Sequence, residues 1–583
     1  MKHSNYSLPS FLEGNIDVTN QETIIELGPG TFVMDYGLQL SNHDTIIKGS
    51  GLEQTILIIN QNIDFDDDSI FEFLGHNGNG ISVSISDLTI KTSVSLTEAN
   101  LKATKLTSQE SYLIKCYNLK SLMMRRVKIE NQFVETTCID IRRGFNLDIR
   151  ECVFANYNRR WTGGGIWLRG DIENVFIEDN DFYKYGNDEV IALWSCNSYV
   201  GHNPAPVGDN NISKKNVNIR LNRFYCQDVN GSTNTGAIIT ESTNWDGCNQ
   251  RFINFYTNQD TNVDNLDVQR DDPCCYNIDG IHFDNNEIFI NAPLSHLITI
   301  SFDKYTLYSD VTVRNNKISY GNWQLDGNYE LVDFCIYYDK TNNAVDDSAF
   351  CDAPFFINGN TIICSDNVRN LRDNNAYQDN HMCLEFKGTT IVFDDNKIVC
   401  TRADYTSDEQ TFANKGVELL HCSVKGGKVF FNRNHCEGLR RLGIFTNNNE
   451  NGIKMIILEG CNNYLQGDTR MNYKNVTESH IYLHHNDYCS DYPVFFLGEF
   501  ADTGDVVFEC NHIYRDITRA NYFTTKAHFY YTSFSNSANN IQSARFVCCL
   551  NDFENVLNSQ MYIFIPSTVS IRHRRNIYSD LTD

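Results

Sequence analysis

Residues 175–182 read VFIEDNDF, and this short sequence pattern decides the fold because it recurs along the chain. Each copy has an apolar residue, any residue, a second apolar residue, a turn usually marked by Asn, and a further apolar residue. A unit this short cannot bury its apolar face alone, so neighbouring copies must stack into a solenoid. The eleven copies are VKIENQFV (127–134), LDIRECVF (147–154), VFIEDNDF (175–182), VNIRLNRF (217–224), IHFDNNEI (281–288), VTVRNNKI (311–318), FFINGNTI (355–362), IVFDDNKI (391–398), VFFNRNHC (429–436), VVFECNHI (506–513) and FVCCLNDF (546–553).

Each copy predicts a strand, a turn and a second strand. Alternation of Val, Ile and Phe with other residues is typical of a strand that buries every second side chain. We expect the Asn to adopt the left-handed backbone conformation, which it tolerates better than most residues. Leucine-rich repeats, propeller blades and helical repeats need frameworks that this chain lacks. The pattern therefore predicts an all-β parallel β-helix with inserted surface loops.

Composition limits the classes of partner. The 583 residues include 41% hydrophobic residues and only 9 prolines, which describes an ordered chain. The net charge of -26 disfavours nucleic acid and anionic lipid as partners. No run of 18 apolar residues predicts membrane insertion, and the start MKHSNYSLPSFLEGN has no apolar segment of a signal peptide. We expect synthesis in a cytoplasm without signal-peptide secretion, and we expect the 20 cysteines to be free buried thiols.

The segment IELGPGTFVMDYGLQLSNHDTIIKGSGLEQTILI (25–58) adds a family resemblance. It resembles the first coils of the pectate-lyase-like right-handed parallel β-helix superfamily, through Gly28-Pro29-Gly30-Thr31-Phe32 and Ile47-Lys48-Gly49-Ser50-Gly51. The resemblance implies a right-handed β-helix over residues 21–560. Residues 1–20 then form an N-terminal segment that could serve attachment, and residues 561–583 form a C-terminal segment. Fold alone does not imply function.

Tryptophan and arginine gather in one region of this acidic chain. Trp161, Trp167 and Trp194 lie close together in sequence with six arginines, which are Arg142, Arg143, Arg150, Arg159, Arg160 and Arg169. Tryptophan faces stack on sugar rings, and arginine binds carboxylates or phosphates in a bidentate manner. We therefore take the three tryptophans and Arg169 as candidate substrate-binding residues. The alternative is that the tryptophans fill the core while the arginines pair with nearby acids.

Carboxylates in the same region are candidate catalytic groups, because glycosidases need an acid and a base or nucleophile. If Val175 and Ile177 point inward, Glu178 points to the exposed face. Two registers remain for residues 188–194: one puts Asp188 outside with Trp194, and the other puts Glu189 outside. The acids of the region are Asp171, Glu173, Glu178, Asp179, Asp181, Asp188 and Glu189.

Asp279 is a further catalytic candidate, in the stretch NIDGIHFDNNEI (277–288). Asn277-Ile278-Asp279-Gly280 resembles the Asn-Thr-Asp-Gly strand of polygalacturonases, and residues 187–192 faintly resemble their second motif. The order of the two motifs is reversed here, and the Gly-His-Gly and Arg-Ile-Lys motifs of that family are absent from the sequence. We therefore do not carry polygalacturonase activity over.

No metal site or cofactor is predicted. His421-Cys422 and His435-Cys436 have the residue types of metal ligands, but neighbours on a strand point to opposite faces and cannot all reach one ion. Gly49-Ser50-Gly51 lacks the third glycine and the helix of a dinucleotide-binding loop.

A large acidic β-helix without an export signal resembles a bacteriophage tailspike or virion fibre. This resemblance implies a homotrimer, located in the virion with other virion proteins, that binds host cell-surface polysaccharide and often depolymerises it. One alternative is a free polysaccharide lyase or glycosidase. Another is a structural virion component without a glycan site, in which the Trp161, Trp167 and Trp194 region is buried against another subunit.

Overall fold

The computed structural model describes these residues: 6–7, 22–64, 69–75, 80–93, 111–131, 136–156, 165–184, 189–194, 211–226, 251–256, 275–291, 296–303, 306–321, 324–325, 331–339, 353–364, 369–370, 381–400, 417–422, 426–446, 453–467, 469, 471–474, 476–490, 495–497, 500–515, 529–531, 545–554, 562–563 and 570–579. Every regular element within these ranges is a β-strand. None of the described segments is a helix that could cross a membrane. The chain divides into two units, and each is described by itself: unit 1 is Met1–Leu294 with Tyr305–Val311, and unit 2 is Ser295–Lys304 with Thr312–Asp583.

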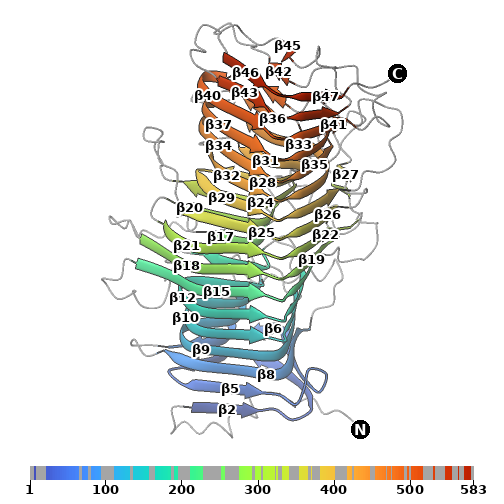
Figure 1. Ribbon diagram of the computed structural model, residues 1–583. Coiled ribbons are helices and arrows are strands. Elements are labelled where there is room, and N and C mark those ends of the chain that lie inside the picture. The colour runs from blue at the N-terminus through green and yellow to red at the C-terminus, as the bar shows by residue number, and fades with distance from the viewer. Residues whose placement is uncertain are drawn as a thin grey trace. The chain divides into compact units, whose positions relative to one another are not determined.

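Both units are stacks of parallel coils, and each coil supplies strands to three sheets (Figure 1). A coil runs along the first sheet, turns sharply, continues into the short second sheet and returns through the third sheet to the next coil. Neighbouring strands are parallel and in register, as in the pairing of Val175 with Val217 and of Val217 with Ile281. The chain is a right-handed parallel β-helix, as the repeat and the family resemblance predict.

In unit 1 the first sheet contains β2 (Glu22–Glu26), β5 (Asp44–Lys48), β15 (Asn211–Arg220) and β18 (Cys275–Asp284). The second contains β3 (Gly30–Tyr36), β6 (Thr55–Asp64), β11 (Val153–Asn156), β13 (Asp181–Lys184), β16 (Arg223–Cys226) and β19 (Glu287–Ile290), with β1 (Tyr6–Ser7) beside β3. The third contains β4 (Leu38–Ser41), β7 (Ser69–Leu74), β14 (Ile191–Trp194) and β17 (Arg251–Tyr256). Four strands bend from one sheet into the next: β8 (Ile81–Thr92), β9 (Ser111–Asn131), β10 (Thr136–Arg150) and β12 (Ile166–Glu178). Strand β21 (Thr306–Arg314) has residues in both units.

In unit 2 the first sheet contains β25 (Pro354–Asn358), β29 (Thr389–Asp394), β32 (Gly427–Asn432), β34 (Ile453–Cys461), β37 (Val476–His484), β40 (Phe500–Glu509), β43 (Arg545–Cys549) and β46 (Ser570–Arg574). The second contains β22 (Lys317–Tyr320), β26 (Thr361–Cys364), β30 (Lys397–Cys400), β35 (Tyr464–Gly467), β38 (Asp487–Ser490), β41 (His512–Arg515), β44 (Asp552–Glu554) and β47 (Ile577–Ser579). The third contains β20 (His296–Asp303), β24 (Leu331–Asp339), β28 (His381–Lys387), β31 (Val417–Cys422) and β36 (Met471–Lys474), and β33 (His435–Thr446) bends from the second sheet to the third. Small separate sheets pair β23 (Gln324–Leu325) with β27 (Arg369–Asn370), and join β39 (Phe495–Leu497), β42 (Phe529–Tyr531) and β45 (Tyr562–Ile563). Strands β46 and β47 lie beyond residue 560, where the sequence pattern was expected to end.

The core of each unit consists of inward side chains that repeat from coil to coil. In unit 1, Phe154, Phe182 and Phe224 follow successive turns, and their rings stack with centroids 4.9 Å apart at each step. These positions are the last apolar residue of each sequence copy, so the pattern and the core agree. The fifteen cysteines whose side chains are described are free thiols, and most are buried.

Inward asparagines at the turns form a ladder in each unit. Asn434 is typical: its Oδ1 accepts hydrogen bonds from the backbone N and the Nδ2 of Asn396 at 2.9 and 3.1 Å, and its Nδ2 donates to the Phe393 carbonyl at 2.8 Å. Every amide in the ladder is thus bonded to the neighbouring coil. The members are Asn180, Asn222 and Asn286 in unit 1, and Asn316, Asn360, Asn396, Asn434, Asn463, Asn486, Asn511, Asn551 and Asn576 in unit 2.

The backbone role expected of these asparagines was wrong. The left-handed residue is the one before each ladder asparagine, for example Asp179 (φ 55°), Leu221 (φ 60°) and Arg433 (φ 58°). The ladder asparagine is needed for its buried side chain, which can donate and accept at once.

The sequence copies also need correction. In VKIENQFV (127–134) the turn lies at Arg126 (φ 51°), so Asn131 belongs to the following strand and donates to the Thr136 carbonyl at 2.7 Å. Conversely, Asn463, Asn486 and Asn576 are ladder members outside the eleven copies.

We predict that Asn463→Ala destabilises the protein much more than Asn462→Gly. The first change leaves the Asn434 backbone N–H and the Phe431 carbonyl without the partners that Asn463 provides. At about 1–3 kcal/mol for each buried group left unsatisfied, the free energy of unfolding should fall by about 2–5 kcal/mol. Asn462 is exposed with φ 55°, and glycine keeps that conformation. Urea unfolding measures both changes, and equal midpoints for the two variants would contradict the role of the ladder.

Candidate functional site

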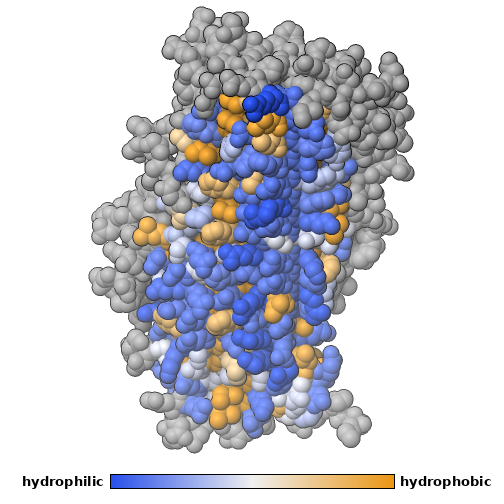
Figure 2. All heavy atoms as spheres, viewed as in Figure 1, coloured by the Kyte–Doolittle hydropathy of each residue, from blue (hydrophilic) through white to orange (hydrophobic). Residues whose placement is uncertain are grey.

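The first-sheet residue just before each turn points outward, because the residue before it points into the core. In four successive coils of unit 1 this position holds Arg125, Arg150, Glu178 and Arg220, which pair in register from coil to coil. Ser86 precedes them in the row and Asp284 follows them. We call these four residues, with Asp148, the arginine column. Figure 2 views the first sheet from outside and shows a mostly hydrophilic face.

Ion pairs link the whole arginine column. Asp148 joins Arg125 at 2.8 Å and Arg150 at 2.5 Å, and Glu178 joins Arg150 at 3.1 Å and also pairs with Arg220. The three arginine side chains remain 38%, 33% and 43% exposed in chain order. Three guanidinium groups thus stand in one row with two carboxylates, and Asp284 follows Arg220 in register in the next coil.

Strand parity predicts that the Glu178 side chain is exposed on the outer face. The side chain does lie on that face, but it is not exposed. Arg150 and Arg220 cover it and leave it 5% exposed. The carboxylate is therefore a partner that positions two arginines, and the accessible groups of the arginine column are the guanidinium groups.

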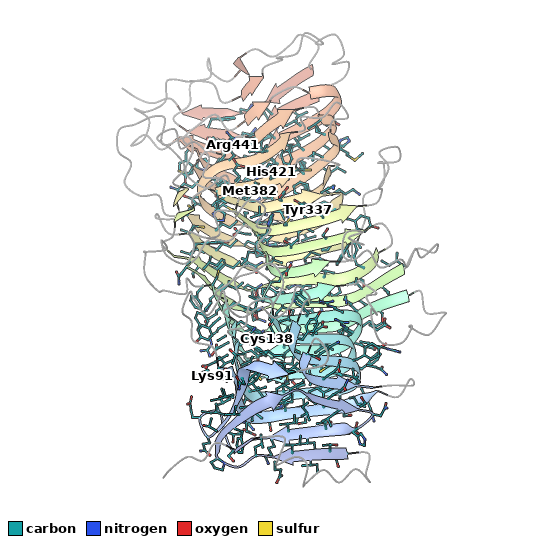
Figure 3. The ribbon with its side chains drawn as sticks, turned by 180° about the vertical axis from the view of Figure 1, so that it is seen from behind. Lys91, Cys138, Tyr337, Met382, His421 and Arg441 are labelled. Carbon is teal, nitrogen blue, oxygen red and sulfur yellow. The ribbon has the colours of Figure 1, made fainter. Side chains whose placement is uncertain are left out.

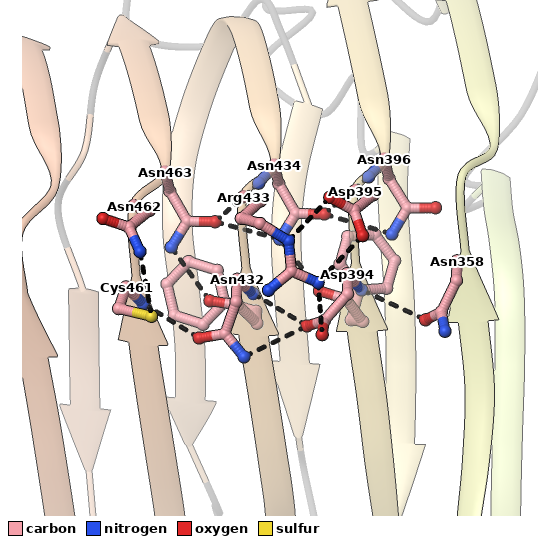
Figure 4. A network of polar contacts seen from close by, with 12 residues as sticks. Asn358, Asp394, Asp395, Asn396, Asn432, Arg433, Asn434, Cys461, Asn462 and Asn463 are labelled. Atoms are coloured by element: carbon pink, nitrogen blue, oxygen red, sulfur yellow. Dashed lines mark hydrogen bonds and ion pairs between the residues drawn. The ribbon is translucent and has the colours of Figure 1, made fainter.

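In four successive coils of unit 2 the same outward position holds Asn358, Asp394, Asn432 and Cys461 (Figure 4). Asp394 Oδ1 accepts from the backbone N and Nδ2 of Asn432 at 2.9 and 3.2 Å. Asn432 Oδ1 in turn accepts from the backbone N of Cys461 at 3.0 Å. A second, outer polar ladder thus runs beside the inner asparagine ladder.

Arg433 joins two adjacent carboxylates of this outer ladder. It contacts Asp395 through Nε and an NH2 at 2.8 Å each, and Asp394 at 3.2 Å. Burial raises the pKa of Asp394, whereas the hydrogen bonds from Arg433 lower the pKa of Asp395. Carboxyl groups whose pKa values are moved in opposite directions can serve as an acid and a base in one site.

The tryptophan and arginine predicted to bind substrate lie together on the third sheet of unit 1, but inside the protein. The Arg169 guanidinium lies 4.5 Å from the Trp167 ring centroid and 3.0 Å from Asp140. Arg142 pairs with the same carboxylate at 2.7 Å and donates to the Tyr112 hydroxyl at 3.1 Å. We call these residues the Asp140 cluster.

The Asp140 cluster is a largely buried network of ion pairs and ring contacts. Trp167 is 1% exposed and packs on Tyr112 and Ala192, so it offers no face to a sugar ring. Beside it, Lys115 and Glu72 form another buried pair at 3.2 Å. For Trp167 and Arg169 the alternative prediction therefore holds: the tryptophan fills the interior and the arginine pairs with an acid.

The remaining predicted residues do not join these groups. Glu189 is buried, and so are the four residues after it, with Ala192 packed on Trp167. Asp279 is exposed and accepts a hydrogen bond from the Ser309 hydroxyl at 2.7 Å. Asp279 precedes a bend at Gly280 (φ 81°) and does not lie in the row of the arginine column. In the same strand it is Asp284 that lies in register with Arg220. Asp188 and Trp161 lie outside the described residues, as does the side chain of Trp194.

A buried polar network in unit 2 has residue types that sequence reasoning did not single out. His381 Nε2 lies 3.0 and 3.1 Å from the two Asp333 oxygens, and its Nδ1 lies 3.4 Å from Cys364 Sγ. The Tyr320 hydroxyl donates to the same carboxylate. Burial raises the pKa of the Cys364 thiol well above its usual range, so the thiol remains protonated and is a poor nucleophile. We therefore assign this network to the structure of the core.

One set of three side chains in the described part of unit 2 could hold a metal ion. His296, Cys335 and Glu385 bring their donor atoms within 4.8 Å of one another. The pattern that sequence analysis considered, His421-Cys422 with His435-Cys436, does not assemble, because His435 pairs with Glu437 at 2.7 Å and stacks on Tyr464.

Comparisons with known proteins give distant structural similarity. No protein-family model matches the sequence, and no curated protein matches it. The catalytic domain of a GH87 alpha-1,3-glucanase in complex with tetrasaccharides is 12% identical, with a TM-score of 0.26, over 85% of this chain and 67% of that chain. The GH136 lacto-N-biosidase from Eubacterium ramulus is 10% identical, with a TM-score of 0.27, over 87% and 68%. The A-module of an Azotobacter vinelandii mannuronan C-5 epimerase is 10% identical, with a TM-score of 0.17, over 99% and 100%.

We predict that Asp140→Asn lowers the free energy of unfolding by about 3–5 kcal/mol, because it leaves two buried guanidinium groups without their carboxylate. The matched control is Asp87→Asn. Asp87 also pairs with an arginine, Arg126, at 2.6 Å, but the Arg126 side chain is half exposed, and we expect a loss of at most about 1 kcal/mol. Chemical unfolding of both variants checks the difference. A small loss for Asp140→Asn would show that the cluster is not an important part of the core.

Proposed function

We propose that the protein is a tailspike-like virion protein that binds host cell-surface polysaccharide. The parallel β-helix, the acidic composition and the exposed arginine column of unit 1 support this proposal. By their descriptions, the solved structures reported above are two glycoside hydrolases and an epimerase, which are all carbohydrate-active enzymes. In this proposal the protein is a homotrimer, is located in the virion with other virion proteins, and contacts neither nucleic acid nor the membrane interior.

The arginine column is the observation that carries the proposal. Its guanidinium groups alternate with carboxylates along the stack of coils and remain partly exposed. Guanidinium groups bind carboxylates, phosphates and hydroxyl oxygens through paired N–H donors. A chain of sugar residues bearing acidic groups can lie along this row and meet one donor set after another. The ion pairs with Asp148 and Glu178 hold the arginines in place before the ligand arrives, which lowers the entropy cost of binding.

A structural virion component without a glycan site is the less favoured alternative. It calls for burial of the tryptophan region against another subunit. Trp167 is already buried within this chain by Tyr112 and Ala192, so its burial does not call for such a contact.

We predict that Arg220→Ala weakens binding to acidic bacterial polysaccharide, whereas Arg223→Ala does not. Both side chains are about half exposed, and each pairs with one carboxylate partner, Glu178 and Asp181 respectively, but Arg223 belongs to the second sheet. A charged contact of this kind contributes about 1.5–3 kcal/mol, so the dissociation constant should rise by roughly ten- to a hundredfold. Binding to a panel of immobilised capsular polysaccharides measures the effect. Equal losses in the two variants would indicate general charge attraction and would contradict a site at the arginine column.

Glycoside hydrolysis is the second candidate function, and one observation favours it. Asp394 and Asp395 are adjacent carboxyl groups whose pKa values are moved in opposite directions by burial and by Arg433. A glycosidase divides its chemistry between a protonated acid and an ionised base or nucleophile. In this candidate Asp394 is the acid and Asp395 is the base.

We predict for this second candidate that oligosaccharide release is lost in Asp394→Asn but kept in Asp279→Asn. Asp394 must be protonated to act, so activity should fall as pH rises through its raised pKa. Asp279 is an exposed acid of unit 1 that does not belong to the outer ladder, and it serves as the control. Chromatography of the products after incubation with bound polysaccharide gives the result. Polysaccharide that is retained without release would exclude hydrolysis and leave the binding function in place.

A further inference from the structure

Three donor side chains from successive coils meet on the third sheet of unit 2. His296 belongs to β20, Cys335 to β24 and Glu385 to β28, and these strands pair in parallel. Cys335 lies in register with Glu385, and His296 reaches the same point from the start of its strand. The three donor atoms lie within 4.8 Å of one another.

We propose that His296, Cys335 and Glu385 form a binding site for a divalent transition metal ion, with Zn²⁺ as the ion that the donor set suits best. A thiolate, an imidazole and a carboxylate are the three side-chain types that bind zinc. Calcium and magnesium take oxygen ligands, so the cysteine and the histidine disfavour them. The thiolate and the carboxylate together neutralise the charge of the ion.

The distances allow the ion to bind with small side-chain movements. Zinc binds sulfur at about 2.3 Å and nitrogen or oxygen at about 2.0–2.2 Å, so its tetrahedral ligands lie roughly 3.5 Å apart. Because the donor atoms lie within 4.8 Å of one another, no gap in the set has to close by more than about 1.3 Å. Cys335 is buried, whereas His296 and Glu385 are half-buried. The ion would be fixed on its inner side and reachable by a fourth ligand from solvent.

The surroundings would hold the ligands in position. The Tyr337 side chain packs against the cluster that contains Cys335, and its hydroxyl interacts electrostatically with Cys335 and Glu385. Hydrogen bonds from neighbouring groups orient metal ligands and raise the affinity of a site. On another side, Cys335 packs against Val332 and Met382, which form an apolar wall.

Polar and charged side chains continue along the next coils of the third sheet. His421 lies in register with Glu385 in the next coil, and Arg441 pairs with Glu418 at 3.5 Å. In Figure 3 Tyr337, Met382, His421 and Arg441 follow one another up the stack. A metal ion here would link three coils through their side chains, which adds stability to unit 2 because binding favours the folded state. This site is independent of the proposed glycan binding.

Titration of the reduced, metal-free full chain with Co²⁺ tests the proposal. Cobalt replaces zinc in such sites, and it reports a thiolate ligand by charge-transfer absorption and a tetrahedral site by strong visible bands. We expect these bands to saturate at one equivalent and to disappear when Zn²⁺ is added. Absence of thiolate charge-transfer absorption in the wild-type protein would overturn the proposal.

Three variants locate the ion. Cys335→Ser should abolish the charge-transfer band, and Glu385→Gln should weaken Co²⁺ binding by at least about tenfold, the loss caused even by changes to groups that only orient metal ligands. Cys461→Ser is the control, because this partly buried thiol lies on the first sheet of the same unit and should leave the band unchanged. A band that persists in Cys335→Ser, or disappears in Cys461→Ser, would contradict the site. If Cys335→Ser does not fold, unchanged affinity in Glu385→Gln would overturn the proposal in its place.

Discussion

The rest of the structure depends on the hydrogen bonds between ladder asparagines of neighbouring coils. A typical ladder amide accepts from the preceding asparagine and donates to a carbonyl of the preceding coil, as Asn434 does with Asn396 and Phe393. Asn180, the first member in unit 1, accepts from the backbone N of Cys152. These groups are buried, so a missing partner would cost about 1–3 kcal/mol, and bonds in a row strengthen one another. The ladder therefore fixes where each coil turns relative to its neighbour within a unit. A coil that slipped by one residue would expose its apolar side chains and break two rungs.

Because the turn is fixed, the residue just before it is also fixed, and it faces outward in every coil. This single position becomes a row of aligned side chains along the first sheet. Four successive coils of unit 1 carry arginine and glutamate in this row, and four successive coils of unit 2 carry asparagine, aspartate and cysteine. The inner ladder must remain asparagine because its amide is buried and bonded on both sides. The outer row is partly solvated, so its residues can vary and acquire a binding function at little cost to stability.

The sequence predicts the fold well because the repeat is the fold: the apolar positions, the turns and the stacked rings of Phe154, Phe182 and Phe224 all follow from it. The sequence pattern also predicts that asparagine marks each turn, although the left-handed conformation belongs to the residue before the ladder asparagine. Asn463 was missed because Gly460 occupies the second apolar position of its copy. A side chain there would meet the Phe431 ring, since an added Cβ would lie 2.3 Å from it. The pattern thus fails where the neighbouring coil already fills the core.

The sites were harder to predict, because they form across coils of unequal length. Strand parity correctly directs Glu178 outward, but nothing local shows that Arg150 and Arg220 will cover it. In the same way, no short motif joins His296, Cys335 and Glu385, which come from three coils. Parity gives the face of a side chain, while its exposure depends on the register partner one coil away. That partner becomes known only when the lengths of the intervening segments are known.

Charge alone does not identify a binding surface in this protein. What identifies it is how far each charged side chain is already paired and buried within the fold. Asp140 is 0% exposed and forms ion pairs with two guanidinium groups, so its charge is already paired within the fold. Arg220 directs its Nε to Glu178 and remains 43% exposed, and a guanidinium carries five N–H donors in all. An external anion gains little from the first group, which it could reach only by breaking buried bonds. The same anion can bind the exposed N–H donors of Arg220 by displacing only water. We therefore expect a ligand to bind at the arginine column and not at the buried Asp140 cluster.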